Sequence, residues 1–273
     1  MTLRQWLRAA QAACPHLERF DLEHLLSVRL DTARAHLLAH LDDALPEMVQ
    51  AQLADDIAAL LAHMPLQYVL GEAWFAGARY EVNEHVLIPR FDTEYLVEAV
   101  LEKVSKPQAQ VLDLCTGSGI IAITLARARH DWQLFASDLS AEALTVAKRN
   151  AERLQAKVAW RQGDFLLPWQ GMRFDVIVSN PPYISAEEYA ALSPEVHKEP
   201  EMALIAAHDG LAFYERLAKE ASHYLLPKGW LAVEIGWQQG QAVQALFKHY
   251  GLKEVACLPD GQGHDRVVVG RCL

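Results

Sequence analysis

From Gln110 onward, short apolar segments alternate with amphipathic ones, and this alternation constrains the fold more than any other feature. We predict seven strands, over 110–115, 133–138, 157–162, 173–179, 229–235, 252–258 and 265–271. Between them we predict helices over 119–129, 140–154, 209–225 and 238–249. Strands that alternate with helices form a mostly parallel sheet with helices on both faces. The sequence therefore predicts an α/β domain over residues 91–273.

The residues before this domain have a different pattern. Over residues 1–64, leucine and isoleucine recur at helical spacing, as in Leu22, Leu25, Leu26, Leu30, Leu53, Ile57, Leu60 and Leu61. Asp21 and the pair Leu45-Pro46 are expected to mark helix boundaries. Residues 65–90 contain a segment typical of a short β-hairpin that turns near Gly77, and the next helix is expected to start near Asp92 or Thr93. We therefore predict a helical domain over 1–64 and a connector over 65–90.

The charge argues against direct binding of nucleic acid. The formal net charge is −10, and residues 1–85 contain 6 Arg, no Lys and 12 Asp plus Glu, a net of −6. A nucleic-acid binder needs a basic face that neutralises phosphates. A helical domain this acidic is better suited to docking a protein.

The four cysteines, Cys14, Cys115, Cys257 and Cys272, are scattered without a C-x-x-C pair. This spacing favours a reducing compartment over a disulfide framework, and it predicts no metal site. The N-terminus has no apolar core of a secretory signal, and no apolar stretch reaches the ~20 residues of a membrane span. We expect a cytoplasmic protein with no membrane contact.

Three segments, each directly after a predicted strand, indicate a nucleoside-containing cofactor. The first is the small-residue turn Cys115-Thr116-Gly117-Ser118-Gly119, which brings backbone amides close to a ligand. The second is Asp138, 19 residues after Gly119, near the ~20-residue offset of a ribose-binding carboxylate. The third is Asp164-Phe165, which offers an acceptor and an aromatic ring to adenine.

Two of these segments also have a plain structural interpretation. The turn could be only a tight turn, and Asp138 could only cap the helix that begins near Ser140. Their order along the chain favours a cofactor that contains adenosine and methionine over NAD.

The fourth segment, Asn180-Pro181-Pro182-Tyr183, follows the apolar strand Phe174–Ser179 and indicates recognition of a planar NH2 group. Asn180 offers a side-chain carbonyl, and Pro181 offers a backbone carbonyl. The proline restricts Asn180 to extended geometry, which aims these two acceptors, and Tyr183 offers an aromatic face. The alternative is a Pro-Pro turn that ends the strand.

With these residues, the chain resembles the class I S-adenosylmethionine-dependent methyltransferases, which have a Rossmann-like fold. More narrowly, it resembles the HemK/PrmC family of peptide chain release factor N5-glutamine methyltransferases. The similar blocks span nearly the whole chain: 65–71, 86–94, 113–119, 178–183, 199–200, 209–211 and 263–266.

The resemblance implies a role for each segment. Residues Cys115 to Gly119 would wrap the methionine end of S-adenosylmethionine, Asp138 would bind the ribose hydroxyls, and Asp164 with Phe165 would frame the adenine. Asn180, Pro181, Pro182 and Tyr183 would hold the substrate glutamine, with Asn180, Pro181 and Tyr183 as the catalytic residues and Asn180 also near the cofactor. Two positions depart from the family, which usually has glycine in place of Cys115 and proline in place of Phe91.

The resemblance also implies the reaction and the partner. The enzyme would methylate the glutamine of the Gly-Gly-Gln motif in class-one release factors, acting as a monomer. Three alternatives stay open: a glutamine methyltransferase of a large-subunit ribosomal protein, a DNA adenine-N6 methyltransferase, and a non-catalytic binding protein of the same fold. The acidic first 85 residues oppose the DNA enzyme, which would have to extract a base from the stack.

Overall fold

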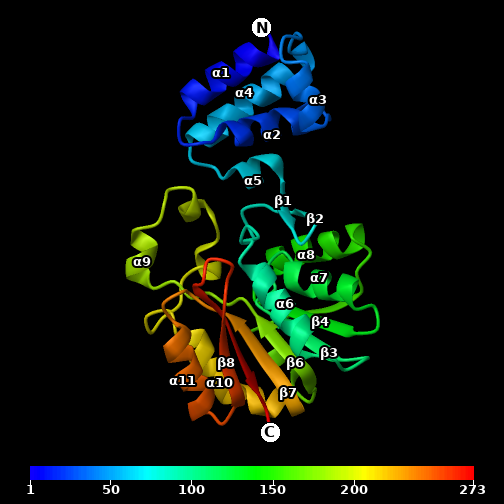
Figure 1. The fold of residues 1–273 in the computed structure, drawn as a ribbon, viewed down its shortest axis with the longest axis vertical. Coiled ribbons are helices and arrows are strands. Elements are labelled where there is room, and N and C mark those ends of the chain that lie inside the picture. The colour runs from blue at the N-terminus through cyan, green and yellow to red at the C-terminus, as the bar shows by residue number, and fades with distance from the viewer. The chain divides into compact units, whose positions relative to one another are not determined.

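A seven-stranded sheet, with strand order β5-β4-β3-β6-β7-β9-β8, organises the larger part of the chain (Figure 1). The structure, a computed structural model, describes residues 1–273. The strands are β3 (Gln110–Leu114), β4 (Gln133–Asp138), β5 (Val158–Gln162), β6 (Phe174–Ser179), β7 (Leu225–Glu234), β8 (Lys253–Pro259) and β9 (Asp265–Arg271). The first five are parallel, and β9 lies antiparallel between β7 and β8. The predicted mostly parallel α/β sheet is confirmed.

Helices cover both faces of this sheet (Figure 1). On one face, α6 (Thr93–Lys103), α7 (Ile120–Ala128) and α8 (Ala141–Arg153) pack over one apolar cluster. On the other, α10 (Ala212–Tyr224) and α11 (Gly240–His249) pack over a second cluster. Because β3 and β6 lie in the middle of the sheet with helices on both faces, most of their residues are buried and most are apolar, as is usual for parallel strands.

Two predicted boundaries on this sheet are wrong. Helix α10 begins at Ala212 instead of residue 209, because His208, Asp209 and Gly210 all have positive φ and form a turn. Strand β7 begins at Leu225 instead of residue 229, because Leu225 pairs with Phe174 across an irregularity in the register.

The hairpin before α6 is formed by β1 (Glu72–Phe75) and β2 (Ala78–Glu81), and it turns at Ala76 and Gly77 as expected. A fully buried asparagine of α8, Asn150, holds it in place. Asn150 Oδ1 accepts the Glu81 N–H at 2.6 Å, and Asn150 Nδ2 donates to the Glu81 carbonyl at 3.0 Å. The same Nδ2 donates to the Ser118 carbonyl at 3.0 Å. One side chain therefore joins the hairpin to the glycine turn.

The first 72 residues form a separate helical unit together with residues 193–198. Its helices are α1 (Leu3–Ala13), α2 (Arg19–Arg29), α3 (Arg34–Ala39), α4 (Glu47–Leu61) and α5 (Leu66–Leu70), and they enclose a leucine-rich core. Asp21 lies inside α2 and not before it, because Glu18 is the N-cap and Asp21 bonds back to its N–H. In the same unit His63 Nδ1 lies 2.7 Å from Glu195 Oε1.

The remaining short elements follow the sheet strands. They are η1 (Leu167–Trp169), α9 (Ala186–Ala190), η2 (Val196–Lys198) and η3 (Glu201–Ala203). None of the helices has both the length and the apolar character that crossing a membrane requires.

Candidate active site

A cavity of ≈ 340 Å³ lies at the carboxyl ends of β3, β4 and β6. Leu114 of β3 pairs with Ser179 of β6, so the segments that follow these strands, Cys115 and Asn180 onward, start side by side. From β3 the chain adds β4 and β5 on one side of the sheet and then β6 and β7 on the other, so the strand order reverses at β3. Open α/β sheets bind ligands at such a reversal. Of the predicted site residues, Cys115, Thr116, Gly117, Ser118, Asp138, Asp164, Phe165, Asn180 and Pro182 line the cavity. Gly119, Pro181 and Tyr183 do not.

The turn after β3 has left-handed backbone at three positions. Cys115, Gly117 and Gly119 have φ of 57°, 55° and 84°. A Cβ at Gly119 would lie 3.0 Å from the Ile123 side chain and 3.1 Å from that of Ala147. Glycine is therefore required at 119 for the approach of α7 and α8. At position 115 the conformation suits glycine, and the cysteine there adopts a φ that L-residues seldom accept.

Asp113, inside β3, was not among the predicted site residues. Its Oδ2 accepts the Thr116 hydroxyl at 2.6 Å and the Ala122 N–H at 3.1 Å, whereas its buried Oδ1 has no partner. Burial raises the pKa of Asp113 to about 7, although both hydrogen bonds lower it. A carboxylate within an otherwise apolar strand is the sequence signal that could have identified it.

Asp138, the last residue of β4, accepts two backbone hydrogen bonds at the cavity. Its Oδ2 accepts the Gly117 N–H at 2.8 Å, and its Oδ1 accepts the Ser140 N–H at 3.0 Å. Burial raises the pKa of Asp138, against the effect of these bonds. The helix cap of α8 is Ser140, whose Oγ accepts the Ala143 N–H at 3.0 Å. Asp138 is therefore not the N-cap that the alternative interpretation supposed.

Arg216, which the sequence analysis did not identify, contacts both residues of the Asp164-Phe165 segment. Arg216 of α10 donates to both Asp164 carboxylate oxygens at 2.9 Å. Its guanidinium also lies 4.5 Å from the centroid of the Phe165 ring. The Arg216 hydrogen bond lowers the pKa of Asp164. Phe165 has φ of 56°, so these contacts hold a strained backbone in place.

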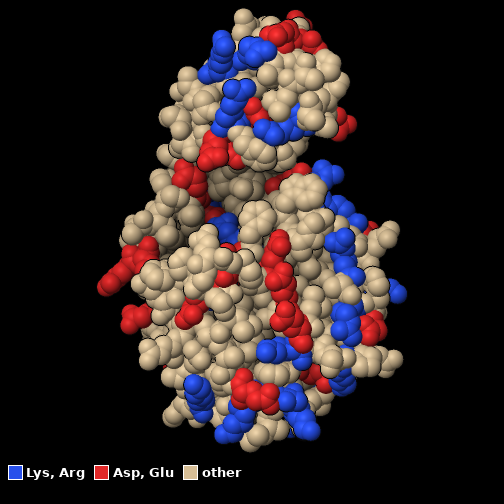
Figure 2. Space-filling model, in the orientation of Figure 1, with Lys and Arg blue, Asp and Glu red and all other residues tan.

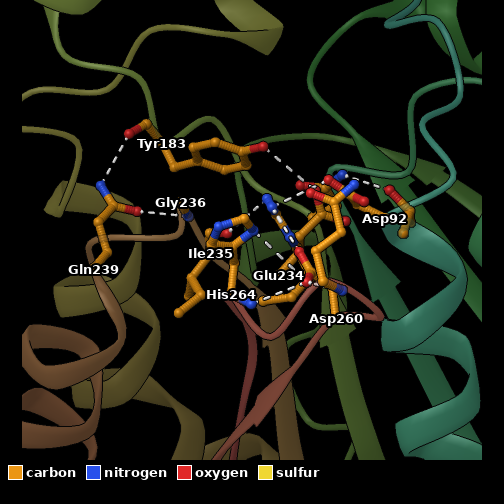
Figure 3. Close-up of polar contacts among 12 residues, drawn as sticks. Asp92, Tyr183, Glu234, Ile235, Gly236, Gln239, Asp260 and His264 are labelled. Carbon is orange, nitrogen blue, oxygen red and sulfur yellow. Dashed lines mark hydrogen bonds and ion pairs between the residues drawn. The ribbon is translucent and has the colours of Figure 1, made fainter.

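Asn180 and Pro181, directly after β6, each have an oxygen atom without a hydrogen-bond partner in the protein. Asn180 Nδ2 donates to Thr93 Oγ1 at 3.2 Å. No hydrogen bond within the protein reaches Asn180 Oδ1 or the Pro181 carbonyl. Tyr183 does not line the cavity, and its hydroxyl donates to Glu234 Oε1 at 3.4 Å (Figure 3). Gln239 Nε2 donates to the Tyr183 backbone carbonyl at 3.0 Å.

Glu234, at the end of β7, lies at the centre of a buried polar cluster (Figure 3). Burial raises its pKa to about 7, although the Thr93 hydroxyl, the Arg266 guanidinium and the Tyr183 hydroxyl favour the charged form. Arg266 is bound in turn by Asp92 and Asp260, each with a carboxylate oxygen at 3.2 Å. Glu234 was also missed by the sequence analysis, because nothing in the chain order shows that its strand ends beside Asn180.

The connector before α6 forms another wall of the cavity. Arg90 forms an ion pair with the buried Glu199, which also accepts the Ile88 N–H at 2.9 Å. Phe91, where the family usually has proline, is 74% exposed. The Arg90–Glu199 pair and the hydrogen bond to Ile88 therefore hold this connector in place without that proline.

Comparison with known proteins identifies two matching family models. Residues 2–71 match the PrmC N-terminal domain, and residues 91–199 match the methyltransferase small domain. The release factor glutamine methyltransferase of Enterococcus faecalis is 39% identical over 254 residues, covering 92% of this chain and 92% of that protein.

Two solved structures share the fold. A methyltransferase from Pyrococcus furiosus has a TM-score of 0.55 at 19% identity, with 83% of this chain and 98% of that chain covered. The 16S rRNA N2 G1207 methyltransferase of Thermus thermophilus, solved with AdoMet and guanosine, has a TM-score of 0.52 at 18% identity, with 74% and 50% covered. They support the class I methyltransferase fold. Because the identity to the Enterococcus protein extends over nearly the full length of both chains, this chain belongs to the family of release factor glutamine methyltransferases.

Proposed function

We propose that the chain transfers the methyl group of S-adenosylmethionine to the side-chain amide nitrogen, N5, of the glutamine in the Gly-Gly-Gln motif of class-one release factors. One observation carries the proposal. Asn180 turns its NH2 toward Thr93, which leaves its carbonyl oxygen free beside the cofactor turn. The neighbouring Pro181 carbonyl is free as well. Two free acceptors match the two hydrogens of a carboxamide.

The residues around the cavity fit the cofactor. The buried Asp113 Oδ1 has no hydrogen-bond partner and offers an acceptor for the methionine amino group. Asp138 is placed to accept ribose hydroxyls, and Phe165 offers an apolar surface to adenine. Cys115 would contact the methionine end with a thiol where the family usually has only backbone. When bound, the cofactor supplies an electrophilic methyl group on a positively charged sulfur.

The chemistry left to the protein is orientation. The amide nitrogen of glutamine is a poor nucleophile, because its lone pair is delocalised into the carbonyl. Acceptors at Asn180 and Pro181 would hold the NH2 hydrogens and point the nitrogen at the methyl group. Positioning of this kind can lower a barrier by ~7–11 kcal/mol. The same oxygens stabilise the positive charge that develops on nitrogen, and the proton leaves after transfer, so no general base is needed.

The partner in this proposal is a protein, as the names of the relatives state for those proteins. Figure 2 shows acidic and basic side chains interspersed over the visible face, and the first 85 residues carry a net charge of −6 from 6 Arg and 12 Asp plus Glu. Both favour a protein over duplex DNA. The proposal includes action as a monomer in the cytoplasm, where release factors work.

The test is mass spectrometry of purified release factor incubated with the enzyme and S-adenosylmethionine. We expect one added methyl on the Gly-Gly-Gln glutamine. Methylation of a ribosomal protein or of duplex DNA, with release factor untouched, would contradict the proposed substrate. Absence of transfer to all three would favour the non-catalytic alternative.

The role of Asn180 has its own test. Asn180→Ala removes an acceptor that acts mainly in the transition state, and loss of one such group costs ~2.7–4 kcal/mol, about a hundredfold or more in rate. Single-turnover methylation measures this, with cofactor binding by calorimetry in parallel. Near-normal turnover by the variant would refute the assigned role.

Asp138 is tested by cofactor affinity. Asp138→Ala removes the proposed ribose acceptor, so the Kd for S-adenosylmethionine should rise about tenfold or more, as expected for loss of a hydrogen bond to a charged group. Calorimetry measures it. An unchanged Kd would contradict the ribose assignment.

A further inference from the structure

We propose that Thr93 fixes which end of the Asn180 side-chain amide faces the substrate. Thr93 would then be a positioning residue for methyl transfer. The inference rests on the proposed function, in which the Asn180 carbonyl oxygen accepts a hydrogen from the substrate carboxamide.

An asparagine amide has two ends of nearly the same shape and opposite chemistry. One end is an acceptor and the other is a double donor. If Asn180 rotated by 180°, it would present NH2 to the substrate NH2, and the two donors could not bond. The orientation of Asn180 therefore decides whether the site can hold its substrate productively.

The observed contact selects the productive orientation. Thr93 is the first residue of α6, lines the cavity and is completely buried. Its Oγ1 lies 3.2 Å from Asn180 Nδ2. With the NH2 end used in this way, Asn180 Oδ1 remains for the ligand.

A hydroxyl could either donate to Asn180 or accept from it, and in the structure Asn180 Nδ2 is the donor and Thr93 Oγ1 the acceptor. The Thr93 hydroxyl also favours the charged form of the Glu234 carboxylate, which is the effect of a hydroxyl that directs its hydrogen toward that carboxylate. A hydroxyl oriented in this way keeps its lone pairs for the Asn180 NH2.

The fold holds these three residues at fixed separations. Ser179 pairs with Val233 across β6 and β7, so Asn180 and Glu234 follow adjacent paired residues. Glu234 also receives the Tyr183 hydroxyl at 3.4 Å. The same carboxylate is therefore the partner of Tyr183 and lies near Thr93, the hydrogen-bond partner of Asn180. The groups that face it are Thr93, Tyr183 and Tyr214, the cation Arg266, and the more distant Asp92.

The test compares Thr93→Val with Thr93→Ser. Valine keeps the shape but cannot accept a hydrogen bond, whereas serine keeps the hydroxyl. Loss of one such bond corresponds to roughly a 3- to 10-fold effect. We expect kcat for release factor methylation to fall by about that factor in Thr93→Val, with KM for release factor and Kd for S-adenosylmethionine little changed. Thr93→Ser should stay within about twofold of the parent.

The outcomes separate this inference from the proposed function. Parent-like kcat in Thr93→Val would overturn the positioning role. Equal losses in Thr93→Val and Thr93→Ser would overturn it as well, since the effect would then not depend on the hydroxyl. If Asn180→Ala loses methyl transfer while Thr93→Val keeps the kcat of the parent, the inference is overturned and the proposed function stands. If Asn180→Ala keeps methyl transfer, the proposed function is overturned. If thermal unfolding shows that the Thr93→Val protein is not folded, Thr93→Ala, which also lacks the acceptor, takes its place in the comparison.

Discussion

Glu234→Gln should make the protein more stable at alkaline pH, and the gain should disappear in acid. In the folded protein burial raises the pKa of Glu234 from its ordinary 4.5 to about 7. Between these two pH values the folded state holds the proton that the unfolded state has released. The free energy of unfolding therefore falls as pH rises from about 4.5 to about 7, and it stays at its lower value above that.

The magnitude follows from the same two pKa values. They differ by about 2.5, and each pKa unit corresponds to about 1.4 kcal/mol, so ionised Glu234 costs about 3 kcal/mol at pH 8. Glutamine has nearly the same shape and no charge. Arg266 keeps Asp92 and Asp260 as partners in the variant. The variant should therefore lose the alkaline penalty without leaving a buried cation unpaired.

The assay is urea unfolding of both proteins at pH 5 and pH 8. The stability of Glu234→Gln relative to the parent should increase by about 2–3 kcal/mol between these pH values. Asp113, whose pKa burial also raises to about 7, adds the same slope to both proteins and cancels in the difference. Glu102→Gln, at an exposed position of α6, is the control and should show no such change. Parallel pH profiles for Glu234→Gln and the parent would refute the reasoning.

Two further substitutions test the supports of the site. Gly210→Ala should reduce methyl transfer at least tenfold with cofactor binding kept, because the new Cβ would lie 2.1 Å from the Tyr183 carbonyl oxygen. Gly251→Ala is the control, because its φ is similarly strained and it has no neighbour within 4 Å. Equal losses of methyl transfer in both variants would contradict this explanation. Arg216→Ala should raise the Kd for S-adenosylmethionine by roughly 2- to 5-fold in calorimetry, because Phe165 loses its cation–π partner. An unchanged Kd would show that the Arg216 contacts do not serve the cofactor site.

The strands and most helices could be predicted because burial on both faces leaves a local record in the sequence. Val111 to Leu114 and Phe174 to Ser179 are mostly apolar, and the residues of the candidate site follow directly at the strand ends. The start of α10 left a different record, which the predicted helix start at residue 209 did not use. His208 and Asp209 adopt positive φ although neither is glycine, and the Asp209-Gly210 pair is a turn dipeptide that marks this boundary.

The supporting residues of the site could not be predicted in this way. Thr93 and Asn180 are 87 positions apart, and their contact depends on where α6 crosses the sheet. Glu234 contacts Tyr183 of the Asn180–Tyr183 segment because β6 pairs with β7, which is a property of strand order. The candidate ligand-binding residues follow individual strands, whereas the residues that contact them are placed by the packing of α6 and by the register between strands.

Asn150 binds the backbone of Glu81 in the hairpin and the carbonyl of Ser118 in the glycine turn with one rigid amide. The side chain is fully buried in close-packed surroundings, which leave it little room to change rotamer. A displacement of β2 is therefore transmitted to the Ser118 carbonyl or breaks a buried hydrogen bond. The hairpin and the glycine turn after β3 are thus mechanically coupled through a single side chain.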